Sequence, residues 1–499
     1  MKAPRALAAS LALALAGCAV GPNYRRPETA SPDAFRGQEG PTEVASLADL
    51  PWWEVFQDPV LQGLIHQALT GDYELQTAAQ RVEQARSLVG VERSPLFPQV
   101  GYEADAARGK NAFLGTLTPG SGTGNNFLAA LNASWEIDLW GRIRRSTEAA
   151  RAEFLGSEAF RRGVWLSLVS NVAQAYFELC ELDLELEIAR HTVESFQETQ
   201  RLFDRQYRGG VASRLQPLRA EAALAQAAAA IPSLEAQIVA KENELSVLLG
   251  RAPGPIPRGA TLVEQSVPPE VPAGLPASLL ERRPDLVESE QTLAAANARV
   301  GVTIAEFLPR IGLTAVYGSV SPELHNLLEK GTNVWFIAAQ AAGPIFQGGR
   351  HYYSYRAAKA QWEQARLQYQ QNVLIALGEV SNALVARQKL AEVRDQEARQ
   401  VEALQESVRL SRVRYLGGLA SYIEVLDAQL QLFPAENALA QAERDLRLTT
   451  VQLYKALGGG WWLDPASPSG PPPPVPPSGP PPGAPPGSPP APLPAPGPP

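Results

Sequence analysis

The sequence predicts a fold that combines long α-helices with a membrane β-barrel, built from two tandem repeats that each hold a β-hairpin and coiled-coil helices. Three observations support this prediction. Two long stretches lack proline and follow the helical period in their hydrophobic residues. Four shorter stretches alternate apolar and polar residues, as strands with one wet face do. Matching segments recur about 208 residues apart, which indicates an internal duplication.

Length and composition exclude several classes of protein. The 499 residues exceed one ordinary core, and a hydrophobic content of 45% is too high for a disordered chain. The net charge of −8 argues against nucleic acid as the main partner, because phosphate binding needs a basic surface. Two cysteines exclude a disulfide framework and a cysteine-rich metal site, and the four histidines are scattered. These counts argue against a metal site built from cysteine or histidine and against a His-based catalytic triad.

The first eighteen residues indicate the destination of the protein. Two basic residues precede an apolar run from Leu7 to Ala16, as in a secretory signal that is too short to span a bilayer. The run ends in Leu-Ala-Gly-Cys, which resembles the lipobox of bacterial lipoproteins, so we expect cleavage after residue 17 and a lipid on Cys18. Ala19 follows, and by analogy the absence of aspartate there favours the outer membrane. The alternative is an ordinary signal peptide with a chance cysteine.

The duplication divides the chain into two channel repeats, 72–250 and 283–458. The segment Tyr-Arg-Gly-Gly-Val-Ala-Ser at 207–213 corresponds to Tyr-Leu-Gly-Gly-Leu-Ala-Ser at 415–421, and Gly-Arg at 141–142 recurs at 349–350. Constant offsets in several motifs indicate a common plan. The remaining predicted segments are the signal peptide 1–17, a lipidated arm and start of the equatorial region at 18–71, a Pro-rich link at 251–282 and a Pro-rich disordered tail at 459–499.

Strands are predicted near 98–108, 126–140, 309–320 and 333–347. In the second of them, the odd positions from Phe127 to Leu139 are all apolar. Such strands suit a soluble sandwich or a membrane barrel with a wet lumen, and the outer-membrane signal favours the barrel. No later stretch has eighteen apolar residues in a row, so a membrane crossing must use strands. Four carboxylates fit lumen-lining charges better than the paired acids of a glycosidase: Glu103, Asp105, Glu136 and Asp138.

The number of strands sets a lower limit on the number of subunits. Four strands cannot close a barrel. Two chains would supply eight strands, and side chains fill the interior of a barrel of that size. Three chains would supply twelve strands and leave space for a pore. A transport channel therefore requires at least three subunits.

The helices set the length of the molecule. The stretches from Gly141 to Tyr207 and from Gly349 to Tyr415 each predict a continuous helix about 100 Å long. Between Leu168 and Phe196, hydrophobic residues at spacings of three and four form a coiled-coil seam, with a second seam beside it. Two seams allow contacts on both sides, as in a closed helical cylinder, and the alternative is an ordinary long coiled coil. The return helices are shorter, and Pro232 is expected to interrupt the first.

These features together resemble the TolC family of outer-membrane channel-tunnels. The lipobox, the Gly-Pro-Asn-Tyr-Arg-Arg-Pro segment at 21–27 and the Pro-Trp-Trp at 51–53 resemble its lipoprotein branch, the NodT type, which serves resistance-nodulation-division (RND) efflux pumps. The resemblance covers roughly residues 15–460. It implies a homotrimer with a twelve-stranded barrel and a periplasmic helical tunnel, anchored to outer-membrane lipid. It also implies export of drugs or other small molecules together with a periplasmic adaptor and an inner-membrane RND pump. The channel it implies is no enzyme, with no catalytic residues, no metal and no cofactor.

The resemblance places the mechanism at the closed tip of the tunnel. The Gly-Gly turns reverse the chain there, because glycine permits a positive φ. In the family such tips meet hairpins of the adaptor. The adaptor contacts that this implies are Arg208, Gly209, Gly210, Leu416, Gly417 and Gly418. For each residue the alternative is a role in the turn alone.

A pore gate is expected just beyond the second turn. Glu424 and Asp427 lie three residues apart on one helix face, so threefold symmetry would form two acidic rings that favour cations. The family has an acidic pair here, and the alternative is a solvated helix face. Gln216 stands where some relatives carry an acidic gate partner, so the closing network is expected to be neutral there. The expected gate residues are Ile423, Glu424, Asp427, Tyr415 and Tyr207.

Other functions stay open at this stage. The outer-membrane channel of a type I protein or peptide secretion system shares the family's fold, although the lipobox favours efflux. A lipid-anchored helical scaffold without a pore would not need the alternating strands. A glycan-processing enzyme is the most distant alternative, because no nucleophile, base or metal cluster converges in the sequence.

Overall fold

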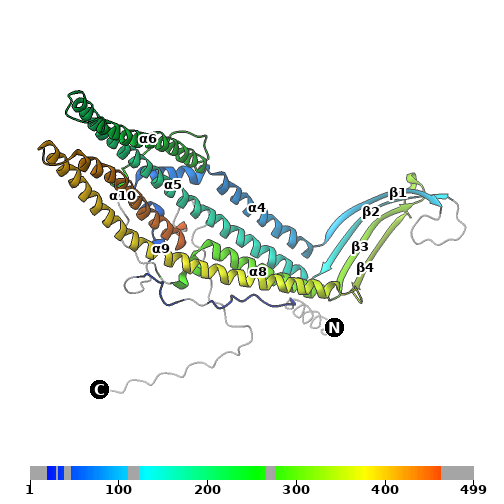
Figure 1. The fold of residues 1–499 in the computed structure, drawn as a ribbon. Coiled ribbons are helices and arrows are strands. Elements are labelled where there is room, and N and C mark those ends of the chain that lie inside the picture. Colours follow the sequence, from blue (N-terminus) through cyan, green and yellow to red (C-terminus); the bar gives the residue numbers. More distant parts are fainter. Residues whose placement is uncertain are drawn as a thin grey trace, which may run out of the picture.

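The computed structural model describes residues 19–29, 32–38, 46–110, 123–265, 274 and 276–461. The predicted signal peptide, Cys18 and most of the Pro-rich tail lie outside the described residues. The molecule is elongated, with long helices at one end and a four-stranded sheet at the other (Figure 1). The predicted combination of long helices and membrane strands in two repeats is confirmed.

One antiparallel sheet contains all the described strands in chain order. They are β1 (Gln99–Lys110), β2 (Thr123–Ile137), β3 (Arg310–Ser321) and β4 (Asn333–Ala342). Tyr102 lies opposite Leu131, which lies opposite Tyr317, which in turn lies opposite Trp335. Among the described strands, β1 and β4 form the two edges, and each leaves one row of backbone groups unpaired.

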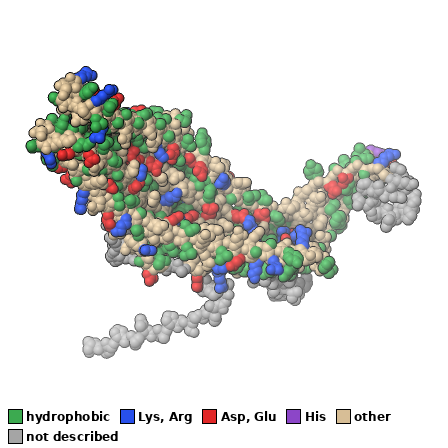
Figure 2. All heavy atoms as spheres, in the orientation of Figure 1, with side chains coloured by type: hydrophobic (Ala, Val, Ile, Leu, Met, Phe, Trp, Pro, Cys, Tyr) green, Lys and Arg blue, Asp and Glu red, His purple; other side chains and the backbone are tan. Residues whose placement is uncertain are grey.

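The two faces of this sheet differ in chemistry. The row just described, together with Val100 and Ile337, forms an apolar face, and Tyr102, Trp335 and Ile337 are each more than two thirds exposed. The opposite face carries polar side chains in β1 and β2, such as Asn132, whereas the residues in register with Asn132 on β3 and β4 are Val316 and Phe336. A large exposed apolar face on a sheet matches lipid better than water. Charged side chains are spread over the helical part of the molecule and are few on the visible face of the sheet (Figure 2).

Two helices of 67 residues run the length of the helical part, α5 (Arg142–Arg208) and α9 (Arg350–Leu416). Their return helices are α6 (Leu215–Leu248) and α10 (Tyr422–Ala456). The prediction that Pro232 would interrupt α6 is wrong, because the helix continues through it. A proline removes one backbone hydrogen bond, and burial of Ala227 and Leu234 on either side of Pro232 keeps the helix in place.

Shorter helices complete each repeat. The helices α6 and α4 (Tyr73–Arg93) lie end to end along α5, and α10 and α8 (Pro284–Ala305) lie end to end along α9 (Figure 1). Two short helices therefore match the length of one long helix in each repeat. The other α-helices are α2 (Trp52–Val55), α3 (Pro59–Gly71) and α7 (Leu279–Arg282). Four single 3-10 turns occur at Leu47–Asp49, Ser94–Leu96, Pro276–Ser278 and Leu324–Asn326.

The main core surrounds the middle of α5. Residues of both predicted seams, such as Leu179 and Tyr176, are fully buried. The segments before and between the repeats add to this core through Trp52 and Ile256. Residues after α10 also join it, since Trp461 is buried and donates its indole N–H to the Arg282 carbonyl. Residues 459–461, which the sequence analysis assigned to the tail, are buried in this core.

Candidate functional site

The candidate site lies at the end of the helical part farthest from the sheet. Here α5 turns into α6, and α9 turns into α10. In the first turn, Val211 N–H bonds to the Gln206 carbonyl and Gly210 N–H to the Tyr207 carbonyl, both at 3.0 Å. The second turn repeats this pattern with Leu419 and Gly418. Both are Schellman motifs, which satisfy the last carbonyl groups of a helix.

The two glycines of each turn have different roles. Gly210 and Gly418 have φ values of 72° and 71°, where a side chain is strained. Gly209 and Gly417 have φ near −77°, which any residue adopts. The turn therefore explains only the second glycine of each pair. The six predicted adaptor contacts, including Arg208 and Leu416, are all exposed on these two turns.

An aromatic cluster joins the two hairpins just below the turns. The Tyr422 ring packs edge-on against Phe203 of α5, with the ring centres 4.2 Å apart, and against Tyr415 of α9 at 5.1 Å. Phe203 and Tyr422 are buried in a second, smaller core at the tip. Since Tyr422 begins α10, this packing fixes where the second hairpin starts relative to α5.

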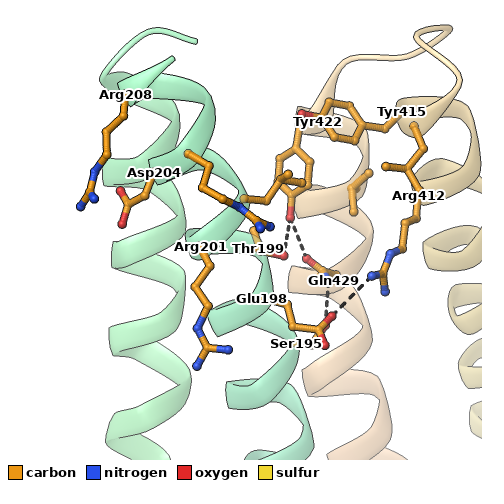
Figure 3. A pocket seen from close by; sticks show the side chains of 14 residues that line it. Ser195, Glu198, Thr199, Arg201, Asp204, Arg208, Arg412, Tyr415, Tyr422 and Gln429 are labelled. Carbon is orange, nitrogen blue, oxygen red and sulfur yellow. Dashed lines mark hydrogen bonds and ion pairs between the residues drawn. The ribbon is translucent and has the colours of Figure 1, made fainter. Parts of the chain in front are cut away.

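A chain of neutral hydrogen bonds reinforces this packing (Figure 3). The Tyr422 hydroxyl donates to Thr199 Oγ1 at 2.8 Å, and Gln429 Nε2 donates to Ser195 Oγ at 2.8 Å. Gln206 Nε2 donates to the Tyr415 hydroxyl at 2.8 Å. Burial raises the pKa of Tyr422 to about 12, so its hydroxyl keeps the proton that it donates.

A groove of about 770 Å³ lies beside this cluster, between α5 on one side and α9 and α10 on the other. Arg412 of α9 pairs with Glu198 of α5 at 3.4 Å across it. Three more arginines of α5 line the groove: Arg201, Arg205 and Arg208. Within the described part of the chain these three have no ion-pair partner. Asp204 also lines the groove, so the three arginines leave an excess of positive charge close to the tip.

The predicted acidic pair lies on the other face of α10. Ile423, Glu424 and Asp427 are exposed, whereas Val425 and Leu426 are buried between them. The Glu424 carboxylate lies 3.9 Å from the Arg414 guanidinium, and Gln431 Nε2 donates to the Asp427 carboxylate at 2.8 Å. Exposed contacts of this kind hold side chains weakly. Both carboxylates are therefore available to face a pore.

Two tyrosines were predicted to belong to the gate, and the structure places one of them in the hydrogen-bonded cluster. Tyr415 belongs to the cluster, whereas the Tyr207 side chain is exposed and its hydroxyl has no hydrogen-bond partner within the described part of the chain. The sequence analysis did not predict a role in the gate for three other members of this cluster: Tyr422, Thr199 and Gln429. A signal existed for Tyr422, because it is an aromatic residue at the first turn of a helix that follows a Gly-Gly turn. Gln216 is exposed and lies outside this cluster.

Two predicted lumen carboxylates have another role. Glu136 makes two hydrogen bonds to the Arg142 guanidinium, at 3.0 and 2.9 Å. Asp138 accepts the backbone N–H groups of Ile143 and Arg144 at the start of α5. Both carboxylates therefore fasten the end of β2 to α5, and their assignment to the lumen stays a prediction. A negative charge at a helix N-terminus is favourable, which explains their residue type.

The N-terminal arm is fixed along the same junction. Arg145 donates to the Val20 and Gly21 carbonyls, both at 3.2 Å, and Arg26 makes a bidentate pair with the buried Glu290. Val20 N–H bonds to the Trp140 carbonyl at 3.0 Å. The arm therefore begins at the point where the sheet meets the helices, and Cys18 itself lies outside the described residues.

The described residues offer no evident metal site. No three His, Cys, Asp or Glu side chains in that part of the chain gather closely enough to hold an ion. The described helices include one, α6, that is long and apolar enough to cross a membrane by length and composition. It packs along α5, and only 22% of its apolar window is buried within the chain.

Comparisons with known proteins agree with this architecture. The chain is 32% identical to the cation efflux system protein CusC of Escherichia coli O6:H1 over 90% of this chain and 97% of the relative. It is 35% identical to the probable efflux pump outer membrane protein TtgC of Pseudomonas putida over 90% and 94%. The solved outer-membrane channel OprN matches with a TM-score of 0.83 and 32% identity, over 89% of this chain and all of that one. The open MtrE channel of Neisseria gonorrhoeae matches at 0.80 and 33%, over 89% and 98%.

The family profile described as outer membrane efflux protein matches residues 64–251 and 275–459. The two matched stretches correspond to the two repeats, since they begin 211 residues apart and end 208 residues apart. Together they cover well over half of the chain. The chain therefore belongs to the outer membrane efflux protein family.

Proposed function

We propose that this chain forms the outer-membrane channel of a tripartite efflux system, as a homotrimer with a barrel of twelve strands. The sheet carries the proposal, because it combines an exposed apolar face with two unpaired edges. Unpaired backbone groups are costly in lipid, so a sheet in a membrane must close on itself. Four strands per chain and three chains supply a barrel wide enough for a pore.

The helical part forms the periplasmic tunnel through which small molecules leave. The relatives reported above are efflux proteins by name, which favours efflux over secretion of proteins. The channel conducts passively and performs no chemistry itself. Transport energy comes from an inner-membrane RND pump, which is connected to the channel by a periplasmic adaptor.

The tip is both the adaptor site and the gate. Arg208, Leu416 and the two Gly-Gly turns are exposed at the end of the helical part farthest from the sheet, so they meet the adaptor first. The aromatic and hydrogen-bonded cluster around Tyr422 and Tyr415 holds the two hairpins together in the closed state. Ile423, Glu424 and Asp427 face the pore, where three copies of each carboxylate attract cations. Tyr207 adds to the closed tip through a contact with another subunit.

Lipid on Cys18 anchors the protein to the outer membrane. Ala19 and Val20 lie against Trp140 and Gly141, where the sheet joins the helices. A lipid on the preceding residue would therefore meet the membrane at the periplasmic end of the barrel.

Single-channel conductance in planar bilayers tests the proposal. Wild-type protein should show a small conductance that prefers cations, because the gate is closed and acidic. The double variant Glu424→Ala/Asp427→Ala should show a larger conductance with a weaker preference for cations. The control is Glu392→Ala/Asp395→Ala, an exposed acidic pair with the same spacing in the body of α9, which should behave as wild type.

Two outcomes would contradict different parts of the proposal. If neither wild type nor either double variant shows any conductance, although insertion into the bilayer is verified, the proposal that the chain forms a channel is contradicted. A double variant that conducts and selects as wild type does would contradict only the assignment of the acidic pair to the pore.

A further inference from the structure

The helices of the two repeats correspond residue by residue. Adding 208 to the bounds of α5 gives the bounds of α9, and adding 211 to the start of α4 gives the start of α8. The same two offsets separate the two stretches that match the family profile. Each contact in one repeat therefore has a defined counterpart in the other, and a contact that only one repeat makes can be recognised.

The N-terminal arm makes such a contact, because it lies along one face of α8. Asn297 of α8 donates to the Pro22 carbonyl of the arm at 2.9 Å, and Glu290 makes the bidentate pair with Arg26. A Cβ built on Gly301 would lie 3.0 Å from a backbone oxygen of the arm. These three residues of α8 define the face that the arm covers.

Within the described part of the chain, no segment covers the equivalent face of α4. The counterparts of the three α8 residues are, in ascending order, Ala79, Arg86 and Gly90. A Cβ built on Gly90 would have open space around it. The Arg86 side chain is 60% exposed and pairs only weakly with the equally exposed Glu83 of the same helix, at 3.2 Å. We call this surface the free face of α4.

The described chain ends beside this face. Trp461 is its last residue, and the Arg162 guanidinium of α5 lies over the Trp461 ring, 4.6 Å from the ring centre. In the other repeat the arm passes Val373 of α9, with which its Thr29 lines a small cavity. The counterpart of Val373 is Trp165, which lies one turn from Arg162 on α5. The Pro-rich tail therefore begins at the level where the arm passes in the other repeat.

We propose that residues 462–470 of the Pro-rich tail lie along the free face of α4 and cover it as the arm covers α8. These residues are outside the described part of the chain. The contact that fixes the tail is an ion pair between Asp464 and Arg86. This inference goes beyond the proposed channel and does not depend on it, because it concerns how the outside of the helical part is held together.

The chemistry of the tail fits this face. Asp464 is the only charged side chain in the sequence from 462 to 499. In the other repeat the arm brings the basic Arg26 to the acidic Glu290, whereas here the tail brings an acidic residue to the basic Arg86. A proline-rich segment has backbone carbonyl groups but few N–H groups, so its partner must supply the donors. The guanidinium of Arg86 carries five of them.

The lengths agree as well. The Arg86 guanidinium lies over the Phe154 ring of α5 at 5.5 Å, as that of Arg162 lies over Trp461. Phe154 and Arg162 are eight residues apart on α5, or about 12 Å along the helix. Asp464 follows Trp461 by three residues, which span about 10 Å when extended. The side chains of Asp464 and Arg86 bridge the small remainder.

Disulfide formation in the full-length protein tests this contact. Asp464→Cys is combined with Arg86→Cys, which replaces both members of the proposed ion pair. The control combines Asp464→Cys with Leu88→Cys, because Leu88 is exposed on the same helix and its counterpart, Arg299, pairs with an α5 glutamate and not with the arm. After mild oxidation, mass spectrometry measures the yield of the linked peptides.

The native cysteines leave a low background in this experiment. Cys180 is buried, and Cys18 is predicted to carry the lipid. We expect a yield several-fold higher with Arg86→Cys than with Leu88→Cys, in a bond within one chain. Equal yields at the two positions, or no linked peptide at either, would overturn the contact. A bond between two chains, seen as a dimer on non-reducing gels, would assign the free face to a second copy and overturn the placement of the tail.

A charge exchange tests the ion pair separately, with a single cysteine in the tail. In Ser467→Cys, a maleimide should react several-fold faster when Arg86→Glu is added, because the tail is released. Addition of Asp464→Arg to that variant should restore the slow rate. The control is Arg81→Glu, the same change of charge at another exposed arginine of α4, which should leave the rate unchanged. A rate that does not respond to Arg86→Glu would overturn the ion pair.

Discussion

At the scale of single residues, Tyr422 couples the two halves of the tip. Its ring touches side chains of α5 and α9, and its hydroxyl reaches Thr199. Thr199 is itself buried, so the loss of this donor leaves a buried hydroxyl with one partner fewer. A neutral hydrogen bond of this kind contributes about 1 kcal/mol, and an unsatisfied buried group costs somewhat more.

Replacement of Tyr422 by phenylalanine should therefore loosen the tip without removing the ring. We expect Tyr422→Phe to lower the stability of the closed tip by about 1–2 kcal/mol and to raise the frequency of channel opening in planar bilayers. The matched control is Tyr73→Phe, because Tyr73 is an exposed tyrosine at the start of α4, outside the tip. Equal opening frequencies in the two variants would contradict a latch at Tyr422.

The sequence alone located this region but not its bonds. The Gly-Gly turns and the acidic pair follow from a local pattern, since the turn needs a residue with positive φ at Gly210 and Gly418. The bond from Tyr422 to Thr199 joins residues 223 positions apart. Hydrogen bonds across that separation depend on how two helices pack, which no local pattern contains.

At the scale of elements, the contact between α5 and α10 contains a buried acidic pair. Glu181 and Glu185 lie one turn apart on α5 and are both buried. Arg444 of α10 lies 3.1 Å from Glu181 and also binds Asp445, while Gln441 donates to Glu185 at 2.9 Å. Burial first, and the neighbouring Glu185 second, raise the pKa of Glu181 to about 7.

This raised pKa predicts how stability depends on pH. The folded chain favours protonated Glu181, so its contribution is complete below the ordinary pKa of a glutamate, near 4.5. The contribution is lost as pH rises through about 7, where the buried carboxyl must ionise beside Glu185. We expect the melting temperature of wild type to fall between about pH 5 and pH 7, the interval between these two pKa values, and that of Glu181→Gln to fall less. Glu187→Gln, an exposed control on the same helix, should keep the wild-type profile. Parallel profiles for wild type and Glu181→Gln would contradict this assignment.

Helices and strands could be predicted from the sequence where a single physical cause determines them. The lengths of α5 and α9 follow from the absence of proline and the period of their hydrophobic residues. The prediction for Pro232 failed because packing along α5 outweighs one lost backbone bond. The bond that Glu136 accepts from Arg142 was not predictable, because alternation gives the face of a strand but not the arginine that approaches it.

At the scale of the whole molecule, the shape of the chain links membrane, tunnel and tip. The sheet is at one end, the candidate gate is at the other, and the N-terminal arm joins the helices where they meet the sheet (Figure 1). Arg145 and Glu290 hold this arm through side chains of α5 and α8. The attachment point of the predicted lipid is thereby set at the periplasmic end of the sheet, although the lipidated residue lies outside the described part.

The two cysteines make the lipid anchor testable with a matched pair of variants. Cells labelled with radioactive palmitate should yield labelled wild-type protein in the outer-membrane fraction, because Cys18 follows a lipobox. Cys18→Ser should lose the label entirely, whereas Cys180→Ser should keep it, since Cys180 is buried in the core of α5. Label retained by Cys18→Ser would place the lipid elsewhere and contradict the anchor. Because the sheet itself inserts into the bilayer, Cys18→Ser that reaches the membrane should still conduct as wild type does, so the anchor governs delivery and placement of the channel while the barrel and the tip govern its conductance.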